Sequence, residues 1–185
     1  MDFKKINIKL LIEGKKTYPS WSTKERHNLY AKEEYPYTTI YYYTKSNKII
    51  SKSFPSDVIL TPKLLYVFGI LIGECPTSLG DSNYRRVTIT NSNPKLIQIV
   101  LEELEKANLL KISYIIDKSI HLLHFKKDDN VVIDYWAKEL NLSTGKFKCF
   151  NDKSKTTDYG VCHVYISNVL LRRVIDLIQE YILNY

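Results

Sequence analysis

The 185-residue sequence contains few cysteines, no long hydrophobic segment and fewer acids than bases. Its three cysteines, Cys75, Cys149 and Cys162, show no framework spacing, which excludes the disulfide-rich secreted class and favours a reducing, intracellular compartment. The longest apolar run, Leu64–Gly73, is about half the ~20 residues that a membrane-spanning helix needs. The first residues lack the small-residue cleavage site of a signal peptide. We therefore expect a cytoplasmic protein with no membrane partner.

The deficit of acidic residues is the main compositional signal. The chain has 27 Lys and Arg against 20 Asp and Glu, a formal net charge of +7 and a pI of about 9.1. Such a balance favours a polyanionic partner, nucleic acid before membrane, although many small basic proteins are merely soluble. The hydrophobic fraction of 44% excludes wholesale disorder, and the length fits one domain with a small extension.

Residues 1–60 form the predicted N-terminal extension and are rich in tyrosine. Strand propensity over Thr38–Tyr43, followed by a turn signal and a second apolar stretch, predicts a β-hairpin. Upstream, Thr23–Glu34 is predicted to be a helix with Ser22 or Thr23 as its N-cap. The tyrosines of Tyr35–Tyr43 have two interpretations: they stack on nucleic-acid bases, or they form a half-buried sheet surface, which is the more common case.

Residues 61–185 form the predicted main domain, an α+β unit with the element order α-β-α-β-β-α-β-β-α. Thr61 before Pro62, and Asn93 before Pro94, have the pattern of a helix cap and first helical residue. The helices are predicted at Pro62–Glu74, Pro94–Ala107, Asn130–Leu140 and Asn168–Leu183. The strands are predicted at Tyr84–Thr90, Leu110–Ile116, Ser119–Lys126, Lys146–Phe150 and Gly160–Ile166. We expect the strands to pair in hairpins, one of them turning at Asp117–Lys118, and the helices to cover one face of the sheet.

The stretch "YVFGILIGEC" places a single carboxylate, Glu74, at the tip of the most hydrophobic segment. Gly69 and Gly73 share one helix face and would leave a smooth groove where a second helix can approach closely. Two such helices would bring two carboxylates together, which favours a bound divalent cation. Mg²⁺ with carboxylate and phosphate oxygens can activate water for phosphodiester cleavage. The alternative is a buried helix with glycines for packing and a solvated Glu74.

The stretch "FGILIGEC" resembles the signature helix of the LAGLIDADG homing endonucleases, a family of DNA-cleaving enzymes. The matching positions are Gly69, Ile70, Leu71, Gly73 and Glu74. Three later segments, "VTITNSNPKLIQIVLEELEK", "YWAKELNLSTGKF" and "YGVCHVYISNVLLRRVIDLI", are similar to a small single-motif branch, so the resemblance spans about Phe54–Ile182. The chain departs from the family in having Glu instead of Asp at its acidic position and Cys75 instead of Gly after it.

The resemblance implies a LAGLIDADG-like α+β fold with a curved antiparallel sheet, helices on one face and double-stranded DNA as the partner. It also implies that Glu74 is catalytic and binds Mg²⁺. Family nucleases use two acids, and this chain has one acid-tipped helix. Either the protein is a homodimer that packs through Val67–Gly73 and cleaves DNA, or it is a non-catalytic DNA-binding protein. A third interpretation is an interaction protein whose basic face meets a protein partner.

In this family DNA lies on the sheet face opposite the helices, and period-two alternation predicts which side chains point there. The predicted DNA-binding residues are Tyr84, Arg86, Thr88, Thr90, Lys111, Ser113, His124, Lys126, Lys146, Lys148, His163 and Tyr165. None is acidic, and the set combines donors suited to phosphates with donors suited to base edges. An ordinary solvated sheet face is the alternative; the lack of acids favours DNA.

Zinc is not expected from the spacing of histidine and cysteine. His121 and His124 are three apart on a predicted strand and therefore point to opposite faces. Cys162 and His163 are adjacent on a predicted strand, so their side chains point to opposite faces. Cys149 therefore cannot share one metal ion with both of them. Mg²⁺ is the one predicted cofactor, and only if cleavage is retained.

Overall fold

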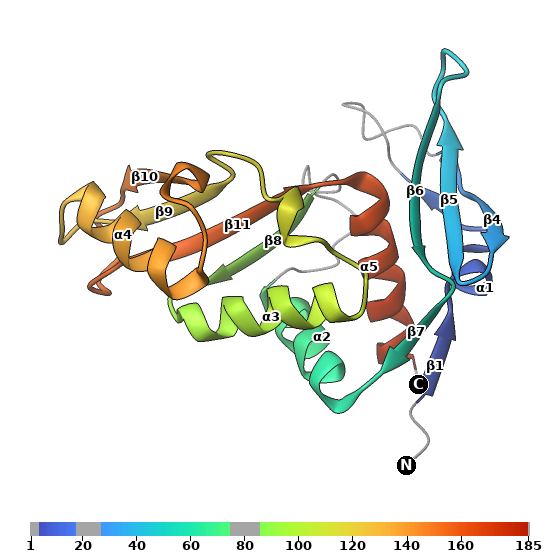
Figure 1. Ribbon diagram of the computed structural model, residues 1–185, viewed down its shortest axis with the longest axis horizontal. Helices are drawn as coiled ribbons and strands as arrows, with labels where there is room; N and C mark the ends of the chain where they lie inside the picture. The colour runs from blue at the N-terminus through green and yellow to red at the C-terminus, as the bar shows by residue number, and fades with distance from the viewer. Residues whose placement is uncertain (1–3, 18–26, 75–85, 185) are drawn as a thin grey trace.

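The computed structural model describes residues 4–17, 27–74 and 86–184, without the Glu74 side chain, and has the α+β class predicted from sequence (Figure 1). The first part contains β1 (Lys4–Asn7), α1 (Ile8–Ile12), β2 (Lys16–Thr17), β3 (His27–Asn28), β4 (Tyr30–Glu34), β5 (Tyr37–Tyr43), β6 (Ile49–Pro55) and β7 (Asp57–Leu60). The second contains α2 (Pro62–Glu74), β8 (Arg86–Asn91), α3 (Pro94–Lys106), β9 (Ile120–His124), α4 (Asp129–Leu140), β10 (Phe147–Asn151), β11 (Val161–Ser167) and α5 (Val169–Leu183). Two short 3-10 helices, η1 (Ile112–Tyr114) and η2 (Thr144–Lys146), precede β9 and β10.

The predicted helix starts are confirmed, because side chains cap the free N–H groups of the first turn. Thr61 Oγ1 accepts a hydrogen bond from Leu64 N at 3.1 Å, and Asn93 Oδ1 accepts one from Lys95 N at 3.0 Å. Asn168 caps α5 in the same way. α3 ends one residue earlier than predicted and α4 begins one residue earlier. No helix in the described part of the chain is both long and apolar enough to cross a membrane.

The main sheet has four strands in the order β10-β9-β11-β8. α2, α3 and α5 pack against β8, and α4 packs against β9 and β10. In Figure 1, α2 and α3 lie below the sheet and α5 stands between it and the N-terminal strands. The inward side chains, among them Ile89, Leu122 and Val164, are almost completely buried against these helices. One face of the sheet therefore belongs to the core.

The predicted strand Leu110–Ile116 and its hairpin with Ser119–Lys126 are wrong. η1 replaces the strand, and Tyr114 and Ile116 are exposed where the alternation predicted them inward. β9 instead lies between β10, to which it is parallel, and β11, to which it is antiparallel. The physical reason is burial: β9 is a central strand, and its partners are those that cover its apolar side chains rather than its neighbours in sequence.

The N-terminal part carries the predicted hairpin, formed by β5 and β6, with β4 as a third antiparallel strand. The predicted helix Thr23–Glu34 is wrong over residues 27–34, which form β3 and β4, and residues 23–26 lie outside the described part. β4 pairs with β5 from Tyr30↔Tyr41 to Glu34↔Tyr37. This long-range ladder satisfies the backbone polar groups that a helix would have satisfied locally.

The N-terminal strands and the main domain share one hydrophobic core. β7 pairs with β1, and α1 and β2 both contact α5. Arg173 of α5 donates from Nε to the Lys16 carbonyl at 2.9 Å. α5 is thus held on one side by the main sheet and on the other by the N-terminal strands (Figure 1).

Candidate nucleic-acid interface

The second face of the main sheet carries partly exposed side chains, because residues there alternate with the buried ones along each strand. We call it the open face. Its members are Arg86, Thr88 and Thr90 on β8, His121 and Leu123 on β9, Lys148 and Phe150 on β10, and Val161, His163 and Tyr165 on β11. No residue in these four strands is Asp or Glu. The open face is therefore neutral to basic over its whole width.

One row of polar side chains crosses all four strands of the open face. The strand registers place Thr90 opposite His163, His163 opposite His121, and His121 opposite Lys148. Thr90 Oγ1 and His163 Nδ1 are hydrogen-bonded at 2.9 Å. Three strand spacings make this row about 14 Å long, close to the ~12 Å width of the major groove of DNA.

A second group of open-face side chains packs ring against ring and cation against ring. The His121 ring lies 4.7 Å from that of Tyr165 and 4.8 Å from that of Phe150, between centroids. The Arg86 guanidinium lies 4.1 Å over the Tyr165 ring, and the Lys148 amine lies 4.8 Å from the Phe150 ring. These contacts hold both cations on the face while leaving them charged.

The two histidines of the row lie in an environment that disfavours their protonated form. Burial lowers the pKa of His163, and the charges of Lys155, His121 and Arg86 lower it further. Burial also lowers the pKa of His121, with Lys148 adding to the effect. Both are neutral near pH 7, so each has one ring nitrogen that donates and one that accepts.

Six predicted DNA-binding residues point outward on the open face: Arg86, Thr88, Thr90, Lys148, His163 and Tyr165. The predicted outward position of His124 is wrong. Its side chain is 3% exposed and points to the α4 side, and His121 takes the outward position on β9. The alternation was displaced by one residue, because the sequence HLLH fits either register and the position of β9 between two strands decides which side chains are buried.

The remaining predicted DNA-binding residues that the structure describes do not lie on the open face. Four described ones lie outside the four strands: Lys111, Ser113, Lys126 and Lys146. Lys126 Nζ is 3.4 Å from the Asp158 carboxylate, and Lys146 Nζ is 3.0 Å from that of Asp117, so each is engaged by an acid on a neighbouring loop. Lys111 directly precedes η1 and Ser113 lies within it, and both are exposed. Tyr84 lies outside the described residues.

The α2 helix presents an exposed apolar stripe. Tyr66 is 55% exposed and Leu65 40%, and both glycines of the motif are exposed. Among the described residues, a Cβ added at Gly69 or Gly73 would meet nothing within 4 Å, so none of them fills the groove that the two glycines form. Glu74 is the last residue of α2, and its side chain lies outside the described part. The described part of the chain therefore leaves room for a second helix at the glycine face.

The tyrosine-rich strands form a surface of their own. Ile40 and Tyr42 of β5 are buried, while Tyr30, Tyr41 and Tyr43 gather on the other face of the sheet. The Tyr30 and Tyr41 rings stack with centroids 5.4 Å apart, and Tyr43 contacts both edge-on. On this partly exposed surface the three rings pack against one another.

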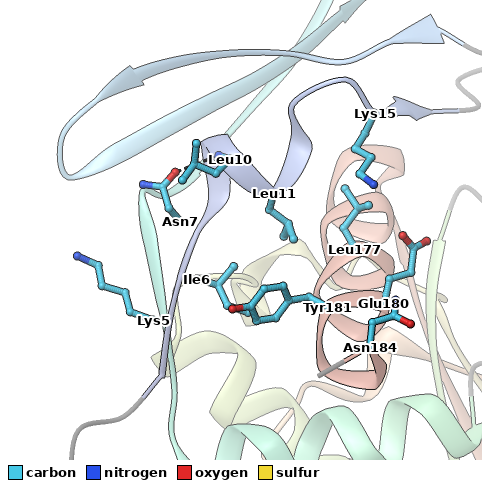
Figure 2. Close-up of a pocket in the computed structure, with 10 residues that line it drawn as sticks. All are labelled: Lys5, Ile6, Asn7, Leu10, Leu11, Lys15, Leu177, Glu180, Tyr181 and Asn184. Carbon is cyan, nitrogen blue, oxygen red and sulfur yellow. Dashed lines mark hydrogen bonds between the residues drawn. The ribbon is translucent and has the colours of Figure 1, made fainter.

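A pocket of about 590 Å³, which the sequence did not indicate, lies between β1, α1 and α5. In Figure 2 the Tyr181 ring lies beside Ile6, and the Lys5 amine points away from the pocket. Lys5 is paired with Asp57 at 2.9 Å, and Glu180 with Arg173 at 3.2 Å. The first pair joins β1 to β7, and the second lies within α5.

The open face and α2 are the features that bear on function, and comparison with known proteins adds no assignment to them. No protein-family model, curated protein sequence or solved structure matches the chain.

Proposed function

We propose that the protein is a cytoplasmic double-stranded DNA-binding protein of the LAGLIDADG homing endonuclease type. Its DNA-binding surface is the open face of β8–β11. In this proposal two copies pack through α2 and cleave DNA with Mg²⁺. The alternative is a non-catalytic, regulatory DNA-binding protein on the same fold.

The observation that carries the DNA-binding proposal is the acid-free open face with its cross-strand row of donors. Thr90, His163, His121 and Lys148 are fixed to four different strands, so their spacing is set by the sheet. Hydroxyl, imidazole and ammonium groups can contact phosphates and base edges, and the flanking Arg86 can do both. A face meant only for water would not need to exclude every carboxylate, because surface acids and bases are usually interspersed.

The exposed stripe of α2 supports the dimer. Two facing helices could approach closely at Gly69 and Gly73, since a Cβ at either position would meet no atom of the described residues within 4 Å. Burying Tyr66 and Leu65 in the same contact would remove apolar surface from water. Both α2 C-termini would then lie together, each with one Glu74.

One carboxylate does not hold Mg²⁺ well, and the dimer supplies the second. Mg²⁺ would contribute an activated water and a counter-charge for the leaving oxygen. The chain's own contribution is to hold the DNA on the open face and the two carboxylates at the dimer axis. The single acidic motif in each chain also favours the non-catalytic alternative, because a monomer would lack the second acid.

The DNA-binding proposal is tested by fluorescence anisotropy with a labelled mixed-sequence duplex at several salt concentrations. We expect affinity to fall steeply with salt, as phosphate contacts release counterions. A protein that binds no duplex at low salt would refute the proposal and leave the protein-partner interpretation.

The catalytic part is tested separately by plasmid nicking with Mg²⁺ and by the solution mass from light scattering. For the nuclease we expect a dimer and cleavage that is lost in Glu74→Gln, with duplex affinity unchanged. A protein that binds DNA as a monomer and nicks nothing would be the non-catalytic alternative. Gly73→Leu is the matched variant for the dimer, because it blocks the α2 groove without touching the open face.

A further inference from the structure

Three side chains from different elements meet at the outer edge of the main sheet, on the side away from the open face. His124 ends β9, Cys149 lies in β10 and Asp129 begins α4. Their ligand atoms, one imidazole nitrogen, the Sγ and a carboxylate oxygen, all lie within 4.8 Å of one another. None of the three belongs to the DNA-binding row or to the α2 motif.

His124 is the feature that points to a ligand. Its side chain is 3% exposed, and neither ring nitrogen has a hydrogen-bond partner within the described part of the chain. Asp129 Oδ1 lies 3.0 Å from Nε2, but out of line with the ring N–H. Buried polar atoms are nearly always satisfied, so an imidazole aimed at a carboxylate and a thiol without a hydrogen bond requires another partner.

The other two groups complete a donor set. Cys149 is half-buried, and its thiol makes a weak contact with the Asp129 carbonyl oxygen, at 3.7 Å. Burial and the Asp129 charge raise the pKa of the Cys149 thiol to about 11, and a bound cation would displace the thiol proton. The Asp129 side chain is 70% exposed, so the site is open to solvent on one side.

We propose that His124, Asp129 and Cys149 bind one zinc-type divalent cation, with water as the fourth ligand on the exposed side. A nitrogen, sulfur and oxygen donor set suits Zn²⁺, whereas Mg²⁺ and Ca²⁺ take oxygen ligands. Tetrahedral Zn²⁺ with ordinary bond lengths separates its ligand atoms by about 3.3–3.7 Å. The present ligand atoms lie within 4.8 Å of one another, and rotation of the exposed Asp129 carboxylate can bring them closer to this range.

The expectation that zinc is absent rested on other combinations of cysteine and histidine, none of which included Asp129. Asp129 is five residues beyond His124, but β9 ends and α4 begins between them, which turns the carboxylate back toward the strand end. Parallel pairing of β9 with β10 then brings Cys149 alongside, opposite Leu122. The site therefore depends on a strand pairing that the sequence did not predict.

The cation would fasten the start of α4 to β9 and β10. β10 is an edge strand, and Lys148 and Phe150, the neighbours of Cys149, point to the open face. Gly160 packs against this end of β9: a Cβ there would lie 2.2 Å from the Leu123 carbonyl oxygen and 2.6 Å from His124 Cβ. The site is structural in this proposal, and it stands whether or not the protein binds DNA.

The test uses the full chain, stripped with a chelator and titrated with Co²⁺, which replaces Zn²⁺ and reports its ligands by absorption. We expect one equivalent to bind, with the visible bands of a tetrahedral site and a sulfur-to-cobalt charge-transfer band, and Zn²⁺ to displace it. Cys149→Ala should remove the charge-transfer band, and Asp129→Asn should weaken binding by at least ~100-fold. Asp134→Asn, a second exposed aspartate on α4, is the matched control and should bind as the wild type does.

The proposal is overturned if the stripped protein takes up no cobalt, or if Cys149→Ala binds it with unchanged affinity and spectrum. Asp129→Asn is the safer variant for folding, because its side chain is exposed and the substitution keeps its size. If it binds cobalt as tightly as Asp134→Asn does, Asp129 is not a ligand and the proposed donor set is wrong.

Discussion

Substituting Lys148 by alanine is the most direct way to locate DNA on the open face. The ammonium is exposed, ends the cross-strand row, and sits 4.8 Å from the Phe150 ring. If it contacts one phosphate, its loss should make the slope of log affinity against log salt shallower by about 0.9. Between 50 and 200 mM salt, the affinity of Lys148→Ala should therefore fall about 3.5-fold less than that of the wild type.

The assay is fluorescence anisotropy with one duplex at four or more salt concentrations, so that the slope is measured and not inferred from one affinity. The matched control is Lys95→Ala, which removes an exposed lysine from α3 on the helical side of the sheet. Both variants lower the net charge by one. A general effect of charge would therefore change both slopes alike.

The two slopes decide the argument. A shallower slope in Lys148→Ala alone assigns a phosphate contact to the open face. An unchanged slope in Lys148→Ala together with a shallower one in Lys95→Ala would place DNA on the helical side and refute our reasoning. Circular dichroism of both variants checks that neither has lost its fold.

Three other predictions concern Gly160, Thr61 and His163. Replacing Gly160 by Ala places a Cβ on a backbone with φ +73°, against the Leu123 carbonyl, and should lower the free energy of unfolding by about 3 kcal/mol. The control is Gly145→Ala, where an added Cβ meets no described atom within 4 Å; equal thermal midpoints for the two variants would contradict this prediction. Thr61→Ala removes the cap of α2 and should cost about 1 kcal/mol in urea denaturation, unless the Leu64 N–H finds another acceptor. Duplex affinity should rise as pH falls from 7 to 5.5, because a nearby phosphate raises the lowered pKa of His163, so that DNA binding takes up a proton. The affinity gains at most tenfold per pH unit for each histidine that takes up a proton, and this gain should be smaller in His163→Gln.

Local signals predicted the helices well, for reasons that the structure makes visible. A capping side chain satisfies N–H groups only two or three residues away, so Thr61 and Asn93 identify helix starts without knowledge of the fold. Apolar periodicity likewise placed the buried face of α3, including Ile97 and Leu104. The hairpin of β5 and β6 was equally local, since a short turn joins its strands.

Strand partners were predicted poorly, because pairing is a long-range choice. β4 forms only through its ladder with β5, which overrode the helical signals of residues 27–34. The displaced alternation at His121 and His124 has a similar cause: an HLLH sequence fits either register, and the position of β9 between two strands decides which side chains are buried.

By itself the sequence determined the α+β class, the helix starts, the basic charge and the exclusion of acids from the strands that form the open face. Only the tertiary structure decided that β9 is central, that His121 joins His163 in one row, and that His124, Asp129 and Cys149 meet at the sheet edge. Capping and periodicity act over a few residues and are written in the order of the chain. Strand order and the convergence of side chains depend on which apolar faces cover one another, and that choice is made by the whole core.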